Sequence, residues 1–445
     1  MTQTGKDKGA ALEWLENRRC VDTMTCHPIP FAESREWAYE AGALRHETGG
    51  FFTVEGVQSR SNIARLDGKQ LPMINQPEIG ILGFLVCKVE DDWRWLLQAK
   101  AEPGNVELVQ LAPTVQATYS NYMCRHGGAE THYISHFTDA SSSFSSDGLH
   151  SEQGSRFLRK FNRNMVKTVE EPLDPLNTNF LWFSSAAVRL SLETDYALNT
   201  DARSVVATAP WNLISGGQRP FSRQLELTGK WRALDKSYQE SDDNIAFMLT
   251  QLKRLREEIK LETAFCSLEK LKGWTVDESK IAQCETASRF EVLHYNVEAS
   301  EREVSQWDQP LFAATDEDKV ILFCQEHQGV LKILLRPCFE VGLTGGVEYG
   351  PSYKADTTHP PKWLQDCIIS TGCRTRAQIN QSDEGGRFMR SCCSYSILEL
   401  HPDQRIPPEK EDCWLTLAQL EKACTTPKLM TNEARSAVSL LLAFS

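Results

Sequence analysis

The strongest constraint on the fold of this chain is an internal repeat that runs through its 445 residues. Strand-like apolar runs recur in the same order in both halves, at 79–89 and 320–325 and then at 93–100 and 330–336. Shorter motifs accompany these runs in the same order. Gln76-Pro77 and Gln309-Pro310 precede the first runs, and Asp91-Asp92 and Gln328-Gly329 mark hairpin turns. Further along the chain, Glu102, Gly104 and Pro113 match Glu340, Gly342 and Pro351; Ser155-Arg156-Phe157 matches Gly386-Arg387-Phe388; Trp182 matches Trp414; and Asp201-Ala202-Arg203-Ser204 matches Glu433-Ala434-Arg435-Ser436. A repeat of this length is too long for a solenoid and predicts duplication of a whole domain.

The stretch 216–242 separates the two halves of the repeat. Apolar residues at helical spacing follow it and predict an amphipathic helix over 245–259, which packs on its own domain or lies at a subunit interface. We therefore predict a first domain over 10–215, a linker over 216–242 and a second domain over 243–445. Short strands joined by tight turns, with a few helices, favour an α+β class with mixed sheets flanked by helices.

Composition and charge limit the partners and the compartment. The net charge of −12 opposes binding to nucleic acid or to an anionic membrane, so a phosphate-bearing partner should be small. No apolar run approaches the roughly 20 residues that span a bilayer, and the polar start lacks the apolar core of a signal peptide, which predicts a cytoplasmic protein. The 14 cysteines include no CxxC pair, which favours reduced thiols over disulfides or a structural zinc site.

The first half carries a dense run of polar residues among apolar ones at 99–122. It offers a carboxylate, two phenols, two amides and a hydroxyl, on Glu102, Thr114, Gln116, Tyr119, Asn121 and Tyr122. Such groups match the donors and acceptors of a polyhydroxylated ligand in a concave site. The alternative is a strand with an exposed polar face.

A second run, 151–166, gathers Arg156, Arg159, Lys160 and Arg163 in an otherwise acidic protein. Arginine binds phosphate through a planar fork and lysine adds a mobile charge, so a nucleotide diphosphate is the expected ligand. A solvated charged face is the alternative.

Three histidines follow the polar run, His126, His132 and His136. The last two are one helical turn apart, a spacing that can place two imidazoles on one metal, but no third ligand is evident. We predict no metal site, and proton transfer or an ordinary structural role for these side chains.

Five segments carry a family resemblance: 74–86 (INQPEIGILGFLV), 99–122, 150–166, 273–279 (GWTVDES) and 307–310 (WDQP). There the chain resembles the NDP-hexose 2,3-dehydratases, enzymes of deoxysugar biosynthesis that act on dTDP-4-keto-6-deoxyglucose. The resemblance implies two tandem Nudix-like domains, a homodimer, a dTDP-hexose substrate and functional coupling to a 3-ketoreductase. No organic cofactor is expected, because the 4-keto group itself acidifies the C3 proton.

The implied reaction takes the C3 proton and eliminates the C2 hydroxyl, which needs a base, an acid and donors to the enolate oxygen. Tyr122 and His126 are the candidates for proton transfer, with Glu102 in reserve, and which residue is base and which is acid stays open. Expected substrate contacts come from Thr114, Gln116, Tyr119, Asn121, Glu152, Arg156, Lys160, Asn162, Arg163 and Asn164. Among these, Arg156, Lys160 and Arg163 are expected to hold the diphosphate.

Two departures qualify the resemblance. Tyr119 stands where the family pattern is expected to have an arginine. The second half has 351–354 (PSYK) in place of 113–116 (PTVQ), and 390–393 (RSCC) in place of the 159–162 region, which predicts a degenerate copy. The glutamate-rich Nudix signature is found in neither half, which argues against pyrophosphate hydrolysis. A non-catalytic nucleotide-sugar binding protein remains the alternative.

Overall fold

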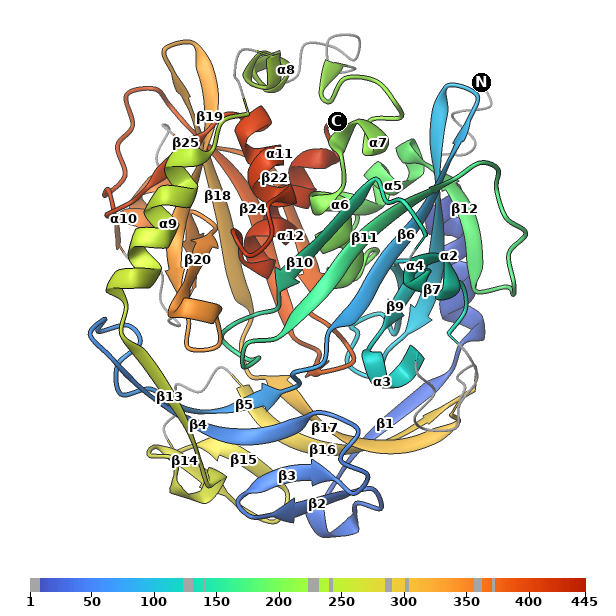
Figure 1. The fold of residues 1–445 in the computed structure, drawn as a ribbon, viewed down its shortest axis with the longest axis vertical. Coiled ribbons are helices and arrows are strands. Elements are labelled where there is room, and N and C mark those ends of the chain that lie inside the picture. Colours follow the sequence, from blue (N-terminus) through green and yellow to red (C-terminus); the bar gives the residue numbers. More distant parts are fainter. Residues whose placement is uncertain are drawn as a thin grey trace.

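The computed structural model describes residues 9–122, 131–139, 141–222, 232–239, 243–284, 290–300, 304–355, 362–369 and 373–445. Over these residues the chain forms two seven-stranded main sheets, two smaller sheets and a set of helices (Figure 1). The predicted α+β class with mixed sheets is confirmed. In the same described segments, no helix is both long and apolar enough to cross a membrane.

The first main sheet consists of β10 (Ser146–Ser151), β11 (Phe161–Val169), β6 (Gly80–Val89), β7 (Asp92–Ala101) and β12 (Phe180–Ser184), with β8 (Val109–Ala112) beside β7 and β9 (Val115–Ala117) beside β6. The second consists of β22 (Cys373–Ser382), β24 (Cys392–Leu400), β18 (Asp318–His327), β19 (Val330–Phe339) and β25 (Cys413–Leu415), with β20 (Val347–Gly350) beside β19 and β21 (Tyr353–Lys354) beside β18. The strand order is the same in both sheets. In each, one parallel pair, β6 with β11 and β18 with β24, lies among antiparallel neighbours.

A layer of helices lies between the two main sheets (Figure 1). It contains α5 (Ser185–Leu192), α6 (Thr200–Thr208), α11 (Leu417–Thr425) and α12 (Asn432–Leu442). Helices α6 and α12 pack against each other, and each reaches the opposite half through a buried arginine. Arg203 of α6 donates to the carbonyl of Ser382 at 2.9 Å, and Arg435 of α12 donates to the carbonyl of Ser151 at 2.6 Å.

The two smaller sheets exchange a strand between the halves. The first contains β13 (Leu261–Cys266), β4 (Thr53–Ser61), β3 (Ala43–His46), β2 (Trp37–Glu40) and β5 (Gln70–Asn75), and the second contains β14 (Trp274–Val276), β15 (Lys280–Gln283), β16 (Phe290–Ala299), β17 (Gln306–Ala314), β23 (Phe388–Met389) and β1 (Met24–Ile29). Strand β1 of the first half pairs with β16 of the second, and β13 of the second half pairs with β4 of the first. The exchange interlocks the halves, which the repeat in the sequence did not indicate.

Two repeat motifs were matched in the wrong register. Pro310 lies inside β17 opposite His294, and the proline in the equivalent position of the first half is Pro72, opposite Gly56 in β5 and β4. Gln76-Pro77 therefore does not correspond to Gln309-Pro310. The first hairpin turn is also one residue earlier than predicted, because Val89 pairs directly with Asp92. Ladder register, and not identity of a dipeptide, decides which positions correspond.

The predicted amphipathic helix over 245–259 is α9 (Ala246–Glu258). Its apolar stripe is buried in the central core through Met248, Leu252 and Leu255, so the stripe packs on its own chain. Part of the predicted linker is also helical, since α8 (Arg232–Gln239) packs on β19. The remaining described helices are α2 (Ala10–Val21), η1 (Phe31–Glu33), α3 (Tyr119–Tyr122), α4 (Ser135–Thr138), α7 (Trp211–Ile214), η3 (Leu268–Lys270), η4 (Thr344–Gly346) and α10 (Lys362–Ile369).

Candidate active site

The polar run 99–122 places three of its side chains next to one another at the end of β7 and on β9. Glu102 is 4% exposed, and its Oε1 accepts a hydrogen bond from Gln116 Nε2 at 3.0 Å and lies 3.4 Å from Lys100 Nζ. Asn199, just before α6, donates to Gln116 Oε1 at 2.8 Å. The other oxygen of Glu102, Oε2, is buried and has no hydrogen-bond partner in the described part of the chain.

Three further carboxyl groups lie in this region, on Glu152, Asp201 and Glu384. Glu152 accepts hydrogen bonds from Asn162 at 2.8 Å and from Asn432 at 3.0 Å. We refer to Lys100, Glu102, Gln116, Glu152, Asp201 and Glu384 as the inner cluster. It combines carboxyl, amide and ammonium groups at the boundary between the two halves.

The carboxyl groups of the inner cluster repel one another when ionised. Burial, and next the charge of Glu384, raise the pKa of Glu152 to about 7. Burial and the charges of Glu384 and Glu152 raise the pKa of Asp201 well above its ordinary value. Carboxyl groups that hold a proton near neutral pH are suited to general acid–base chemistry.

Glu384 reaches the cluster on a turn that belongs to the second half. The amide of Gly104 donates to the carbonyl of Gly385 at 2.8 Å, and the amide of Arg390 donates to the carbonyl of Gly104 at 2.8 Å. Position 104 accepts only glycine, because an added Cβ would lie 1.7 Å from the carbonyl oxygen of Phe388. Burial raises the pKa of Glu384, Arg387 opposes the rise and Glu102 adds to it.

The corresponding positions of the second half form a closed ion cluster. Lys354 occupies the place of Gln116, since it pairs with Val320 as Gln116 pairs with Leu82 in the other main sheet. Its Nζ lies 2.5 Å from an oxygen of Glu340 and 2.5 Å from an oxygen of Glu433. An internal lysine therefore occupies the position of the neutral Gln116, whereas in the first half the cation beside Glu102 is Lys100 of β7.

The predicted site residues divide between the two faces of the first main sheet. Gln116 and Asn164 face the helix layer, where Asn164 donates to Ser204 of α6 at 2.9 Å. Tyr122 packs on the opposite face, in a core that contains Met165 and Val115. Because side chains alternate along a strand, Arg163 of β11 also lies on that outer face. The predicted Tyr122 and Glu102 are thus separated by the sheet.

The basic run 151–166 does not form one cationic patch. Arg156 lies over the ring of Phe290 at 4.0 Å, Arg159 donates to Thr263 at 3.0 Å, and Lys160 is 4% exposed and donates to the carbonyl of Glu78. Arg163 forms two hydrogen bonds with Asp147. The four side chains point to different environments because Arg156, Arg159 and Lys160 lie in the irregular segment before β11, whereas Arg163 lies on the strand itself.

The remaining predicted contacts have varied surroundings. The Thr114 hydroxyl is buried, donates to the carbonyl of Leu96 and accepts from the amide of Leu85, so it joins two strands. Tyr119 is 38% exposed and meets Tyr122 edge to face. Asn121 is exposed. His126 lies outside the described residues.

The predicted histidine pair lies on the outer side of the first main sheet. His132 contacts Asn177 at 3.2 Å, while burial and then the charge of Lys167 lower the pKa of His136. Among the residues that the structure describes, no group of three or more His, Cys, Asp or Glu side chains could hold a metal ion. The described cysteines are free thiols.

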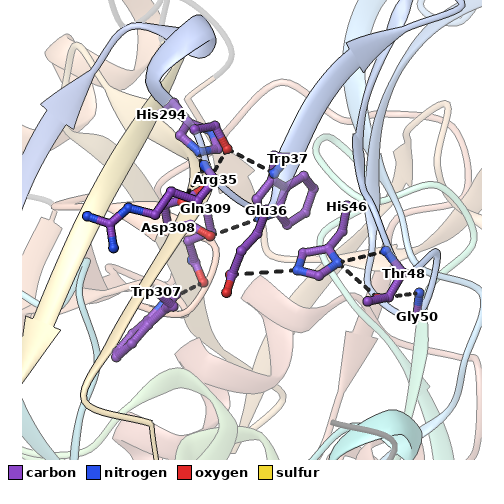
Figure 2. Close-up of polar contacts among 11 residues, drawn as sticks. Arg35, Glu36, Trp37, His46, Thr48, Gly50, His294, Trp307, Asp308 and Gln309 are labelled. Carbon is purple, nitrogen blue, oxygen red and sulfur yellow. Dashed lines mark hydrogen bonds and ion pairs between the residues drawn. The ribbon is translucent and has the colours of Figure 1, made fainter.

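The WDQP segment, residues 307–310 on β17, joins the halves. Asp308 is 3% exposed, and its Oδ1 lies 2.7 Å from His294 Nε2 and accepts from Ser34 Oγ at 2.6 Å. Trp37 donates to the Asp308 carbonyl at 2.9 Å (Figure 2). Burial alone would raise the pKa of Asp308, but the hydrogen bonds from His294 and Ser34 outweigh it and lower the pKa to about 2.

Several residues of the inner cluster were not predicted as site residues. Lys100 lies in the polar run, where the prediction included only neutral groups and one carboxylate. Asp201 was noted in the sequence only as part of a repeat motif. The matching residue of the second half, Glu433, also carries a carboxylate, and this shared charge was a signal for a site residue. Glu384 gave no signal, because it lies 282 positions from Glu102 in the chain and only the fold unites them.

Comparison with known proteins identifies the class to which this fold and site belong. Residues 8–209 and 246–441 match the NDP-hexose 2,3-dehydratase family. Three relatives are named dTDP-4-dehydro-6-deoxy-alpha-D-glucopyranose 2,3-dehydratase. Those from Saccharopolyspora spinosa and Amycolatopsis orientalis are each 31% identical over 96% of this chain, covering 90% and 88% of the relative. That from Streptomyces violaceoruber is 29% identical over 95% of this chain and 94% of its own length.

The chain belongs to the NDP-hexose 2,3-dehydratase family. The family predicted from the five sequence segments is therefore confirmed. A dehydratase role in deoxysugar biosynthesis is supported, and the non-catalytic binding protein is not favoured.

Proposed function

We propose that this protein removes the C2 hydroxyl of dTDP-4-keto-6-deoxyglucose as a hydro-lyase. Family membership and the activity for which the three relatives are named support this substrate. The observation that carries the proposal to this chain is the inner cluster. There a buried Glu102 oxygen, which has no hydrogen-bond partner among the described residues, lies beside the partly exposed Lys100 and Gln116. Groups of these types bind sugar hydroxyls and transfer protons.

The chemistry needs one base and one acid and no organic cofactor. The 4-keto group acidifies the C3 proton and takes up the electrons when that proton leaves. Glu102 is our choice of base, because Gln116 and Lys100 hold its Oε1, while its Oε2 has no hydrogen-bond partner among the described residues and is left to accept a proton. A positioned acid or base contributes about 10²- to 10⁴-fold to the rate.

A competing assignment within the same function places proton transfer on Tyr122 and His126. It would put the sugar on the outer face, near Arg163. Burial and the neighbouring Tyr119 raise the pKa of Tyr122, which keeps the phenol protonated and disfavours a role as base. The inner cluster is therefore preferred.

The test of the function is incubation of the pure protein with dTDP-4-keto-6-deoxyglucose, with a ketoreductase added to trap the product. A dehydratase yields a product that has lost the C2 oxygen. Unchanged substrate would indicate a binding protein, and release of dTMP would indicate a hydrolase.

Two matched variants then distinguish the assignments. Glu102→Gln is expected to lower kcat by about 10²-fold or more, and Tyr122→Phe to change it by less than about threefold. The opposite pattern would move the chemistry to the outer face while the function itself stands.

We also propose that the halves are copies of one Nudix-like domain over 10–215 and 243–445, with turnover in the first. The equal strand order of the main sheets supports the duplication, and the Lys354 ion cluster supports a second half that does not turn over. A Tyr353→Phe variant should leave kcat unchanged.

We further propose that the protein is a cytoplasmic homodimer and that it is functionally coupled to a 3-ketoreductase. The support for a dimer is the family resemblance together with Phe247 and Leu249 of α9, which are 41% and 45% exposed. Light scattering at micromolar concentration should give twice the chain mass, and a monomer would remove the dimer.

A further inference from the structure

The turn that follows β22 brings an ionisable side chain of the second half, Glu384, over Glu102 of the first. A Cβ placed on Gly386 would lie 3.5 Å from Glu384 Oε1 and 3.6 Å from Glu102 Oε1, so both carboxyl groups lie beside the same glycine. Glu384 is partly exposed, whereas Glu152 and Asp201 are 3% and 2% exposed. A ligand beside Glu102 can therefore meet Glu384 more readily than it can meet the buried pair.

The reciprocal turn of the first half lacks this carboxyl group. It lies over the second half in the same way, because the amide of Gly342 donates to the carbonyl of Gly154 at 2.9 Å as that of Gly104 does to Gly385. A Cβ on Gly154 would lie 2.9 Å from Glu340 Oε2, the counterpart of Glu102. The position that corresponds to Glu384 is Gln153, and an amide cannot exchange a proton at neutral pH.

The WDQP segment fixes the turn that carries Glu384. Gln309 Nε2 donates to the carbonyl of Gly386 at 2.9 Å, and Trp307 Nε1 donates to Gln309 Oε1 at 3.1 Å, which orients the amide. Between them in sequence, Asp308 is held by His294 and the first half (Figure 2). The strand β17 thus couples the junction of the halves to the turn 384–387.

We propose that Glu384 is a catalytic residue of the first-half site, supplied by the second half, and that Gln309 is the residue that positions it. The inference rests on the proposed dehydration. Glu102 takes the C3 proton, and the electron pair passes through the C4 enolate into a C2–C3 double bond. The C2–O bond breaks as Glu384 gives its proton to the departing oxygen. Water leaves, Glu384 ends ionised and Glu102 ends protonated.

The direct test compares Glu384→Gln, Glu384→Asp and the exposed control Glu326→Gln by kcat, dTDP binding and pH profile. Glu384→Gln should lower kcat by about 10²- to 10⁴-fold, keep dTDP affinity within about threefold and remove the alkaline limb of the profile. Glu384→Asp keeps a carboxyl group and should recover part of the rate. Full activity of Glu384→Gln, or equal inactivity of the Gln and Asp variants, would overturn the inference.

The positioning role is tested with Gln309→Ala, against Gln306→Ala, an exposed glutamine of the same strand. Gln309→Ala should lower kcat about tenfold with an unchanged KM and with both limbs of the pH profile kept, because the acid remains but is misplaced. An unchanged kcat would remove this role. If the wild type and the Glu384→Gln variant are both active, only the assignment of Glu384 is refuted. If the wild type is inactive, the proposed function and this inference are refuted together.

Discussion

Gln116 and Lys354 occupy the same position in the two main sheets and give their neighbouring carboxylates opposite surroundings. Gln116 is neutral and donates one hydrogen bond to Glu102 at 3.0 Å. One oxygen each of Glu102, Glu340 and Glu433 has no hydrogen-bond partner among the described residues, so the two clusters differ in the charge of residue 116 or 354. Lys354 lies 2.5 Å from both Glu340 and Glu433. Burial opposes the charge of Lys354, but the two carboxylates outweigh it and raise its pKa well above the ordinary value. One residue type thus separates a cluster held by a neutral amide from one closed by a buried cation.

Replacing Gln116 by lysine should close the first-half cluster. A lysine at this position would pair with Glu102 as Lys354 pairs with Glu340, which would tie up the proposed base. We expect turnover to fall by about 10²-fold or more while the fold is kept. Gln116→Leu, which removes the amide without adding charge, separates the two effects. Steady-state assays decide, and turnover of Gln116→Lys within about threefold of the wild type would contradict the explanation.

Replacing Lys354 by methionine should destabilise the protein. Glu340 and Glu433 would be left buried without a cation, which costs about 3–5 kcal/mol when one partner of a buried ion pair is removed. Urea denaturation measures the loss, with Lys253→Met as control because the side chain of Lys253 is 78% exposed. Turnover by the folded protein should be kept. A variant as stable as the wild type would show that the ion cluster contributes nothing.

Glu348 should make stability fall as the pH rises. Its side chain is 0% exposed and accepts from Ser151 Oγ, and burial raises its pKa to about 7. A raised pKa favours the protonated folded state, so this contribution is complete below about pH 4.5 and is lost as pH rises through about 7. Glu348→Gln should be more stable than the wild type by about 1–3 kcal/mol at about pH 8 and show little gain at about pH 4.5. A gain that does not change with pH would refute this.

Asp308 should act in the opposite direction. Its pKa of about 2 lies below that of an unfolded aspartate, so its contribution is present above about pH 4 and is lost as the pH falls through about 2. Asp308→Asn should therefore be less stable at about pH 7 by about 1–3 kcal/mol, and the gap should narrow between about pH 4 and about pH 2. Denaturation midpoints across this range measure it, with the exposed Asp403→Asn as control. A stability difference that stays constant over this pH range would show that the loss comes from packing and not from the charge of Asp308.

Part of the fold and of the site could be predicted from the sequence because it depends on local pattern. The order of apolar runs and turns predicted an α+β class with mixed sheets, and the helical spacing of apolar residues such as Met248, Leu252 and Leu255 predicted the helix α9. The polar run 99–122 contained Glu102 and Gln116, which do lie together. Long family segments identified the family.

Only the tertiary structure decided which of these groups share a site. Tyr122 and Gln116 are six positions apart, yet Tyr122 on α3 packs in the core on the outer face of the sheet, whereas Gln116 on β9 faces the helix layer. The alternation of side chains along β11 assigns Arg163 to the outer face as well. Glu384 and Asn432 reach the first-half cluster because the halves are interlocked by the exchange of β1 and β13, a pairing between distant segments. Composition and spacing describe what each segment offers, whereas contacts between distant segments depend on how the whole chain packs.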